Sequence, residues 1–223
     1  MSNLVFTPAA LETVLSLPGL PGGGSRIYDR SRYGSYGAIT GAAWERLPSG
    51  LWCLSFDGSD DYVSLESRSS LNPVDGLTVE AWVYLASHKN YNYILHKEIW
   101  VANGWGLIGD SAGAVNFQLR HNANGNWEIA TINPSAGTWH HIVGTVDYLA
   151  DIASLYLDGI LGDSDNTPTG TIEPENNTGT LYLGASSNSF DGKITLVRIY
   201  NRPLTALDVQ NNFNREKHLF GVW

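Results

Sequence analysis

Leu77-Thr-Val-Glu-Ala-Trp-Val-Tyr-Leu85 alternates apolar residues with polar or aromatic ones. A period of two places Val79, Ala81 and Val83 on one face of a β-strand. The other face carries Glu80 and Trp82. One side of this strand therefore suits an apolar core, and the other side suits a groove or a covering loop. This pattern is typical of a strand in a two-sheet sandwich.

Similar short phrases, each ending in Asp-Gly or a Gly-rich break, lie on both sides of this stretch. They predict strands at about 51–57, 61–66, 77–86, 92–97, 104–110, 114–120, 126–131, 138–147, 152–158, 180–184 and 192–201, with short edge strands within 27–31 and 37–44. Asn124-Gly125 and Asp158-Gly159 are good hairpin turns. Many short strands with almost no helix signal predict an all-β, two-sheet antiparallel sandwich.

One short helix is expected near the C-terminus, at 205–214. Thr205 is followed three residues later by Asp208, a variant of the capping box. The segment 1–25 is interpreted as an N-terminal arm or irregular segment, with a short helical turn at 7–15, because its Pro- and Gly-rich end breaks regular structure. Residues 26–223 are then a single sandwich domain.

Composition excludes several classes of function. The 223 residues carry a formal net charge of −9 and 13 Lys or Arg, which argues against nucleic-acid binding and attachment to anionic membranes. No apolar run is long enough to span a bilayer, so membrane insertion is not expected. The single cysteine, Cys53, lies in an apolar strand and is expected to be buried. The N-terminus lacks the basic region of a signal peptide.

The strand phrases, with Tyr28-Asp-Arg-Ser31 before them and Ile199-Tyr-Asn-Arg-Pro-Leu-Thr205 after them, resemble laminin-G-like domains of the concanavalin A-like lectin/glucanase superfamily. The resemblance covers roughly residues 26–214. It implies a jelly roll of one concave and one convex sheet, and binding or adhesion more often than catalysis.

Catalytic patterns are missing from the sequence. Glycoside-hydrolysing relatives carry Glu-x-Asp-x-Glu on one strand, which aims three carboxylates into a cleft. No such triplet occurs, and Glu80 has no acidic partner two residues away. His140 and His141 are adjacent in a strand, so their rings are expected on opposite faces. The sequence predicts that this chain is not an enzyme.

The resemblance also implies a possible calcium site. Related domains use a carbonyl of a Phe-Asp-Gly turn, here Asp57 and Gly58, and a carboxylate of the last strand, where this chain has Thr195. A neutral hydroxyl is a poor substitute for an anionic ligand. The alternative is that Asp57, Asp60 and Asp61 only build turns through Asx hydrogen bonds.

Aromatic residues interleaved with Asn, His and Lys mark the expected contact surface. Flat rings supply apolar area and polar groups supply directional hydrogen bonds, the combination that a sugar needs. The candidate ligand-binding residues are His88, Tyr91, Tyr93, Trp100, Trp105 and Trp127. Tyr93, Trp105 and Trp127 have an alternative role as core residues on inward strand faces.

Two functions remain open. The first is a non-catalytic carbohydrate-binding or adhesion module on a cell or virion surface, with a glycan or protein partner. The second is a structural protein of a virus particle, such as a capsid decoration or tail-associated domain, acting through protein contacts. Its termini, 1–25 and 218–223, would then contact neighbouring subunits or form a homo-oligomer, although the apolar tail can also pack back on the sandwich. A glycan hydrolase or lyase is the least favoured.

Overall fold

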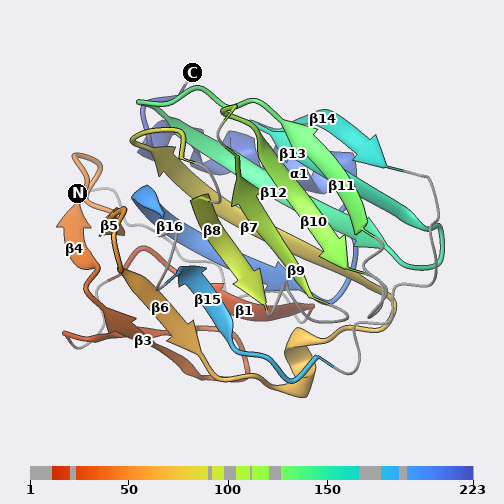
Figure 1. Cartoon of the computed structure of the whole chain (residues 1–223), viewed down its shortest axis with the longest axis horizontal. Coiled ribbons are helices and arrows are strands. Elements are labelled where there is room, and N and C mark those ends of the chain that lie inside the picture. Colours follow the sequence, from red (N-terminus) through yellow and green to blue (C-terminus); the bar gives the residue numbers. More distant parts are fainter. Residues whose placement is uncertain are drawn as a thin grey trace.

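The structure is a computed structural model that describes residues 12–20, 24–89, 92–97, 104–110, 112–120, 127–165, 177–185 and 190–222, with the backbone alone for 127–129. Within these residues the chain forms two antiparallel sheets packed face to face, with a helix near the C-terminus (Figure 1). The predicted sandwich is confirmed.

Sheet A contains the strand that opens the sequence argument. Its order is β14 (Ile160–Asp165), β13 (Ile152–Leu157), β12 (Trp139–Asp147), β7 (Gly76–Leu85), β16 (Asp191–Tyr200), β5 (Trp52–Asp57) and β4 (Ala43–Arg46), and β1 (Thr13–Leu17) also pairs with β16. The Asp158-Gly159 turn joins β13 to β14 with positive φ at both residues, 52° and 81°. Positive φ at both central residues is what a type I′ hairpin requires.

Sheet B lies nearer the viewer in Figure 1. Its order is β11 (Trp127–Ile132), β10 (Val115–Arg120), β9 (Trp105–Gly109), β8 (Asn92–Lys97), β15 (Leu181–Gly184), β6 (Tyr62–Leu65), β3 (Tyr36–Thr40) and β2 (Arg26–Tyr28). A short 3-10 turn, η1 (Ser69–Leu71), follows β6.

The inward faces of the two sheets form one apolar core. Val79, Ala81 and Val83 of β7 have no exposed surface, as their alternation predicted. Close packing between the sheets is clearest at Gly144 of β12, where a Cβ atom would lie 2.5 Å from the ring of Phe117 in β10. Only glycine allows the two sheets to approach this closely here.

The expectation of an irregular segment up to residue 25 is wrong for Thr13–Leu17. These residues form β1, which pairs with β16, and Val14, Leu15 and Leu17 lie in the core. The reason is that they bury apolar side chains against a strand 180 or more residues away in sequence. The predicted helical turn at 7–15 falls largely outside the described residues.

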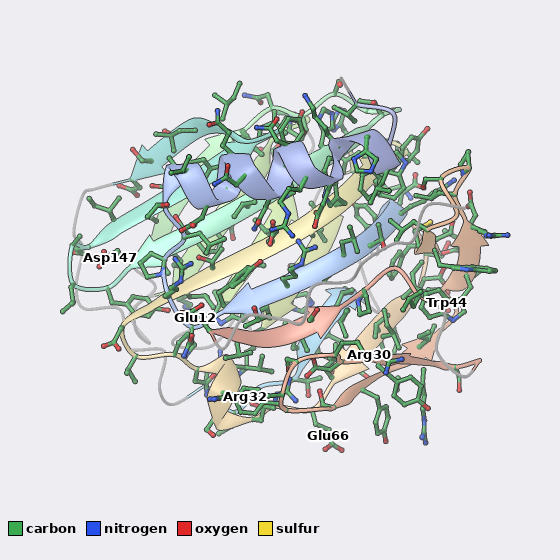
Figure 2. All side chains as sticks on the ribbon, turned by 180° about the vertical axis from the view of Figure 1, so that it is seen from behind. Glu12, Arg30, Arg32, Trp44, Glu66 and Asp147 are labelled. Carbon is green, nitrogen blue, oxygen red and sulfur yellow. The ribbon has the colours of Figure 1, made fainter. Side chains whose placement is uncertain are left out.

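The outer face of sheet A is covered by α1 (Ala206–Glu216), as Figure 2 shows. Thr205 and Asp208 form the expected capping box. The chain continues through η3 (Lys217–Leu219) and returns to the sheet, where Phe220 stacks on Trp82 with ring centroids 4.0 Å apart. Residues 217–222 therefore pack on their own domain. Neither α1 nor the short 3-10 turns among the described residues has the length and apolar character needed to cross a membrane.

Candidate functional site

Part of the outer face of sheet B is open to solvent. Strand register aligns Arg26 with Ala38, Ala38 with Ser64, Ser64 with Tyr182 and Tyr182 with His96 across five neighbouring strands. Directly paired residues lie on the same face of a sheet. This row therefore lies on the outer face of sheet B, because the intervening positions Val63, Leu65, Leu181 and Leu183 lie in the core.

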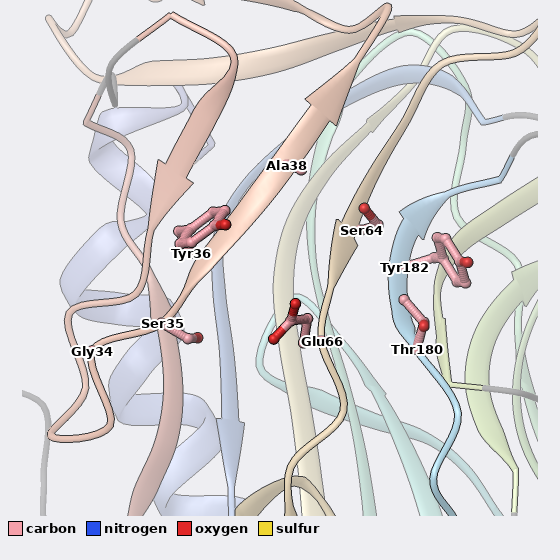
Figure 3. A pocket seen from close by; sticks show the side chains of 8 residues that line it. All are labelled: Gly34, Ser35, Tyr36, Ala38, Ser64, Glu66, Thr180 and Tyr182. Carbon is pink, nitrogen blue, oxygen red and sulfur yellow. The ribbon is translucent and has the colours of Figure 1, made fainter.

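A hollow of about 490 Å³ lies on this face, over β3, β6 and β15. Its walls include the rings of Tyr36 and Tyr182, and Figure 3 shows the Glu66 side chain between them. Its volume is in the range of small-ligand sites. The remaining lining residues are small or hydroxyl-bearing: Gly34, Ser35, Ala38, Ser64 and Thr180.

The hollow exists because small and large side chains alternate across the strands. Ala38 and Ser64 are cross-strand neighbours and form a low floor, whereas Tyr36 and Tyr182 rise on either side. Tyr36 is 44% exposed. The floor and walls thus combine apolar ring surface with hydroxyl groups and one carboxylate.

Two further groups extend the wall at Tyr36. The ring centroid of Tyr28 on β2 lies 6.5 Å from that of Tyr36. Tyr28 is exposed, like Tyr36. The guanidinium of Arg26 lies over the Tyr36 ring at 4.4 Å. A cation stacked on an aromatic face fixes the ring without covering its other side.

The opposite wall is held by a line of rings. Tyr182 stacks on His96 at 5.3 Å and meets Tyr62 edge-on at 5.9 Å, and His96 in turn contacts Tyr93. Burial lowers the pKa of His96 from 6.5 to about 4, and the backbone of Gly184 offsets part of this effect. The histidine is therefore neutral at physiological pH and acts as an aromatic support for Tyr182.

This lowered pKa predicts a pH-dependent stability. Between pH 6.5 and about 4 the unfolded chain binds a proton that the folded chain does not bind at His96, so stability falls as the pH falls through this window. The contribution reaches at most about 3 kcal/mol. His96→Phe keeps the ring contacts and should flatten this part of the curve in urea unfolding measured from pH 4 to 7. Parallel curves for the two proteins would contradict the prediction.

The sequence-predicted ligand residues do not assemble into one site. Trp105 is 1% exposed and lies in the main core, because its position on β9 points inward. Tyr93 is 4% exposed and packs with Ile108 and Ala185. Both are corrected to structural residues. His88 is exposed and lies against Gly113, away from the hollow. Tyr91, Trp100 and the side chain of Trp127 lie outside the described residues.

Thr195 lies apart from Asp57 and Gly58, the other residues of the implied calcium site. Asp57 pairs with Asp191, whereas Thr195 lies four residues further along β16, which is about 13 Å. The Thr195 hydroxyl donates to the carbonyl of Trp52 instead. Thr195 is therefore corrected to a structural residue.

A lysine occupies the neighbourhood of the Phe-Asp-Gly turn. The ammonium of Lys89 lies 3.2 Å from the Gly58 carbonyl and 3.6 Å from a carboxylate oxygen of Asp191. One carboxylate oxygen from each of Asp57, Asp60 and Asp61 lies within 4.8 Å of the other two. Asp57 accepts the N–H of Ser59, and Asp61 accepts the N–H of Asp57. These are the turn-building hydrogen bonds of the alternative interpretation.

A serine, a histidine and an aspartate meet at the start of β12. Ser135 Oγ is 3.2 Å from Nε2 of His140, whose Nδ1 is 2.8 Å from Asp158. This order is that of a hydrolase triad. However, Nε2 also lies 3.1 Å from the Ser135 carbonyl oxygen, and Asp158 accepts the N–H of His141. Ser135 meets the His140 ring through both its hydroxyl and its carbonyl oxygen, and Asp158 contacts both the ring and the backbone of β12, so these contacts hold the β13–β14 turn against β12.

A buried cluster under α1 contains Glu80, His141 and Glu216. Its carboxylates already accept hydrogen bonds or ion pairs from the chain. Glu80 accepts from His141 and Arg198, and Glu216 accepts from Trp82 Nε1 at 2.8 Å and pairs with Arg198. The cluster fastens the helix to sheet A. The two histidine rings lie on opposite faces of β12, as predicted, since His140 pairs with Val83 and His141 with Trp82.

Tyrosines on the outer face of sheet B are the functional candidates that sequence reasoning missed, with Tyr28 and Tyr36 exposed and Tyr62 and Tyr182 half-buried. Tyr28, Tyr36, Tyr62 and Tyr182 occupy alternate positions opposite buried aliphatic residues. That alternation was a usable signal, because an aromatic ring on the outward phase of an amphipathic strand faces solvent or a ligand.

Comparison with solved structures supports the architecture. The receptor-binding domain of botulinum neurotoxin D has a TM-score of 0.71 and 17% identity, over 92% of this chain and 53% of that chain. A structure of botulinum neurotoxin type C, which interacts with two ganglioside molecules, has a TM-score of 0.72 and 16% identity, over 92% and 51%. A binding domain of neurotoxin DC in complex with SialylT has a TM-score of 0.71 and 15% identity, also over 92% and 51%.

These similarities establish a shared fold, and this chain spans about half the length of the toxin chains. No curated protein matches the sequence. A family model described as the concanavalin A-like lectin/glucanases superfamily matches residues 57–210, more than half of the chain. The chain therefore belongs to the laminin-G group of the concanavalin A-like lectin/glucanase superfamily.

Proposed function

We propose that this chain is a non-catalytic glycan-binding module and that the hollow on the outer face of sheet B receives the glycan. The observation that carries the proposal is the pairing of two tyrosine walls, Tyr36 and Tyr182, with a hydroxyl-bearing floor and a carboxylate. The fold family includes lectins, and two of the similar toxin structures are named for ganglioside or SialylT binding. Both facts support a carbohydrate ligand.

The chemistry of the hollow matches that of a sugar ring. A pyranose has an apolar face of C–H groups, which packs on a tyrosine ring. Its hydroxyl groups need directional partners, and Glu66, Ser64 and Thr180 offer acceptors and donors around the same space. Arg26, at the edge, adds a guanidinium donor.

The same lining argues against glycoside hydrolysis at this site. Hydrolases of this kind need two carboxyl groups that flank the scissile bond. Among the eight described residues that line the hollow, Glu66 is the only acid. The hollow can hold and orient a sugar, but it lacks the second acid needed to cleave one.

Replacing Tyr36 tests the proposal. Tyr36→Ala removes an exposed ring from the wall and should weaken glycan binding at least tenfold, while unfolding changes little because the ring is 44% exposed. Binding is measured first on a glycan array and then by calorimetry with a glycan that binds. Leu149→Ala, at an exposed position in the β12–β13 turn, is the control. Failure of the unmodified protein to bind any glycan would overturn the proposal and favour a protein partner.

A further inference from the structure

We propose that the ligand of this face is a linear oligosaccharide of about three sugar units that lies across the strands, not a single sugar held in a closed pocket. This inference deepens the proposed function and rests on it. The observations that carry it are the spacing of the tyrosine rings and the open side of the hollow at β2.

Three tyrosine rings, two exposed and one half-buried, lie in a line across the outer face of sheet B. Tyr182 on β15 and Tyr36 on β3 are separated by one intervening strand, β6. They are also offset by two residues along the strands, because the register aligns Tyr182 with Ala38 through Ser64. Strand spacing and residue rise place them about 12 Å apart. Tyr28 on β2 continues the line, with its ring 6.5 Å from that of Tyr36. Three rings over this length match three consecutive sugars better than one.

The two ends of the line differ. Beyond Tyr182, the rings of His96 and Tyr93 pack against each other, and Tyr93 is 4% exposed. Beyond Tyr36, Tyr28 is 39% exposed and Arg26 is exposed on the same face. The chain of the ligand can therefore extend past β2, whereas the packed rings limit it past β15.

The middle of the line is polar. Glu66 is exposed and directly follows Leu65 of β6, and its side chain lies between Tyr36 and Tyr182 in Figure 3. A carboxylate between the two rings accepts hydrogen bonds from the hydroxyl groups of the sugars that stack on them. Ser64, two residues earlier in β6, adds a hydroxyl group to the same hollow. Stacking positions therefore flank a central hydrogen-bonding position.

Ladders of homo-oligosaccharides test the inference. Glucose, N-acetylglucosamine, galactose, mannose and xylose series, each from one to six units, are titrated into the protein by calorimetry. For a series that binds, we expect the Kd to fall at least tenfold from the monosaccharide to the trisaccharide and less than threefold from there to the hexasaccharide. A monosaccharide that binds as tightly as its trisaccharide overturns the inference and leaves the proposed function standing. If the protein binds branched glycans on the array but no member of any linear ladder, the inference is also overturned and the proposed function stands.

Variants locate the individual positions. Tyr36→Ala should weaken both di- and trisaccharide binding, whereas Tyr28→Ala should weaken the trisaccharide more than the disaccharide, because Tyr28 lies at the end of the line. Leu149→Ala, on the other sheet, should change neither. Equal losses for di- and trisaccharide in Tyr28→Ala would overturn the assignment of Tyr28 to a third position. Absence of binding to every ladder and every array glycan overturns the proposed function itself.

Discussion

Glu80→Gln is expected to lower the free energy of unfolding by about 3 kcal/mol. The Glu80 carboxylate is fully buried between β7 and α1. It accepts hydrogen bonds from His141 at 2.8 Å, Tyr200 at 2.6 Å and Asn212 at 3.1 Å, and it pairs with Arg198 at 3.2 Å. An amide of the same shape turns one acceptor into a donor that faces other donors, so buried partners lose their hydrogen bonds.

The pKa of Glu80 gives the same variant a pH signature. Burial alone would raise this pKa, but the charge of Arg198 and the hydrogen bonds from His141 and Tyr200 hold it well below its ordinary value of 4.5. A depressed carboxyl pKa contributes stability that is present above pH 4.5 and is lost as the pH falls below it. Glu80→Gln should therefore cost most at neutral pH and progressively less in acid.

Urea unfolding followed by tryptophan fluorescence measures both effects. Glu66→Gln is the matched control, because it makes the same chemical change at an exposed position and should stay within about 0.5 kcal/mol of the unmodified protein. A loss below 1 kcal/mol for Glu80→Gln at pH 7 would show that the network under α1 is not a main attachment of the helix.

The sequence predicted the fold where strands alternate and have clear turns. The strand expected at 77–86 is observed at Gly76–Leu85, and the helix expected at 205–214 at Ala206–Glu216. Thr13–Leu17 was missed because four of its five residues are buried, which erases the period of two, and because its partner strand is distant in sequence. The strand β14 is missing from the predicted strands because most of its sequence is polar, although the predicted hairpin turn at Asp158-Gly159 does fold it back onto β13.

The candidate site was harder to predict because its residues are distant in sequence and are brought together only by the pairing register of the strands. Tyr28, Tyr36 and Tyr182 span more than 150 residues in sequence and meet only through the pairing of β2, β3, β6 and β15. The tryptophan-rich segment was favoured because its aromatic residues are close in sequence. Trp105 shows why closeness in sequence misleads, because the alternation of side chains along β9 directs its ring into the core.

Filling the hollow is expected to have the largest effect on binding. Ser64 lies on the floor, paired with Ala38 on one side and Tyr182 on the other. Paired Cβ atoms lie about 5 Å apart, so a tryptophan at this position would occupy the space between the walls. Ser64→Trp should weaken glycan binding at least a hundredfold, which corresponds to about 2.7 kcal/mol.

Ser64→Ala separates blocking from loss of a hydroxyl group. Alanine keeps the floor low and removes one hydrogen-bonding group, so its affinity should stay within about tenfold of the unmodified protein. Calorimetry with the same oligosaccharide gives both values, and unfolding curves establish that each variant is folded. If Ser64→Trp folds and binds as well as Ser64→Ala, the sugar does not enter the space above Ser64. The glycan site must then lie on another surface, because a ligand seated between Tyr36 and Tyr182 cannot avoid a side chain that rises from the floor between them.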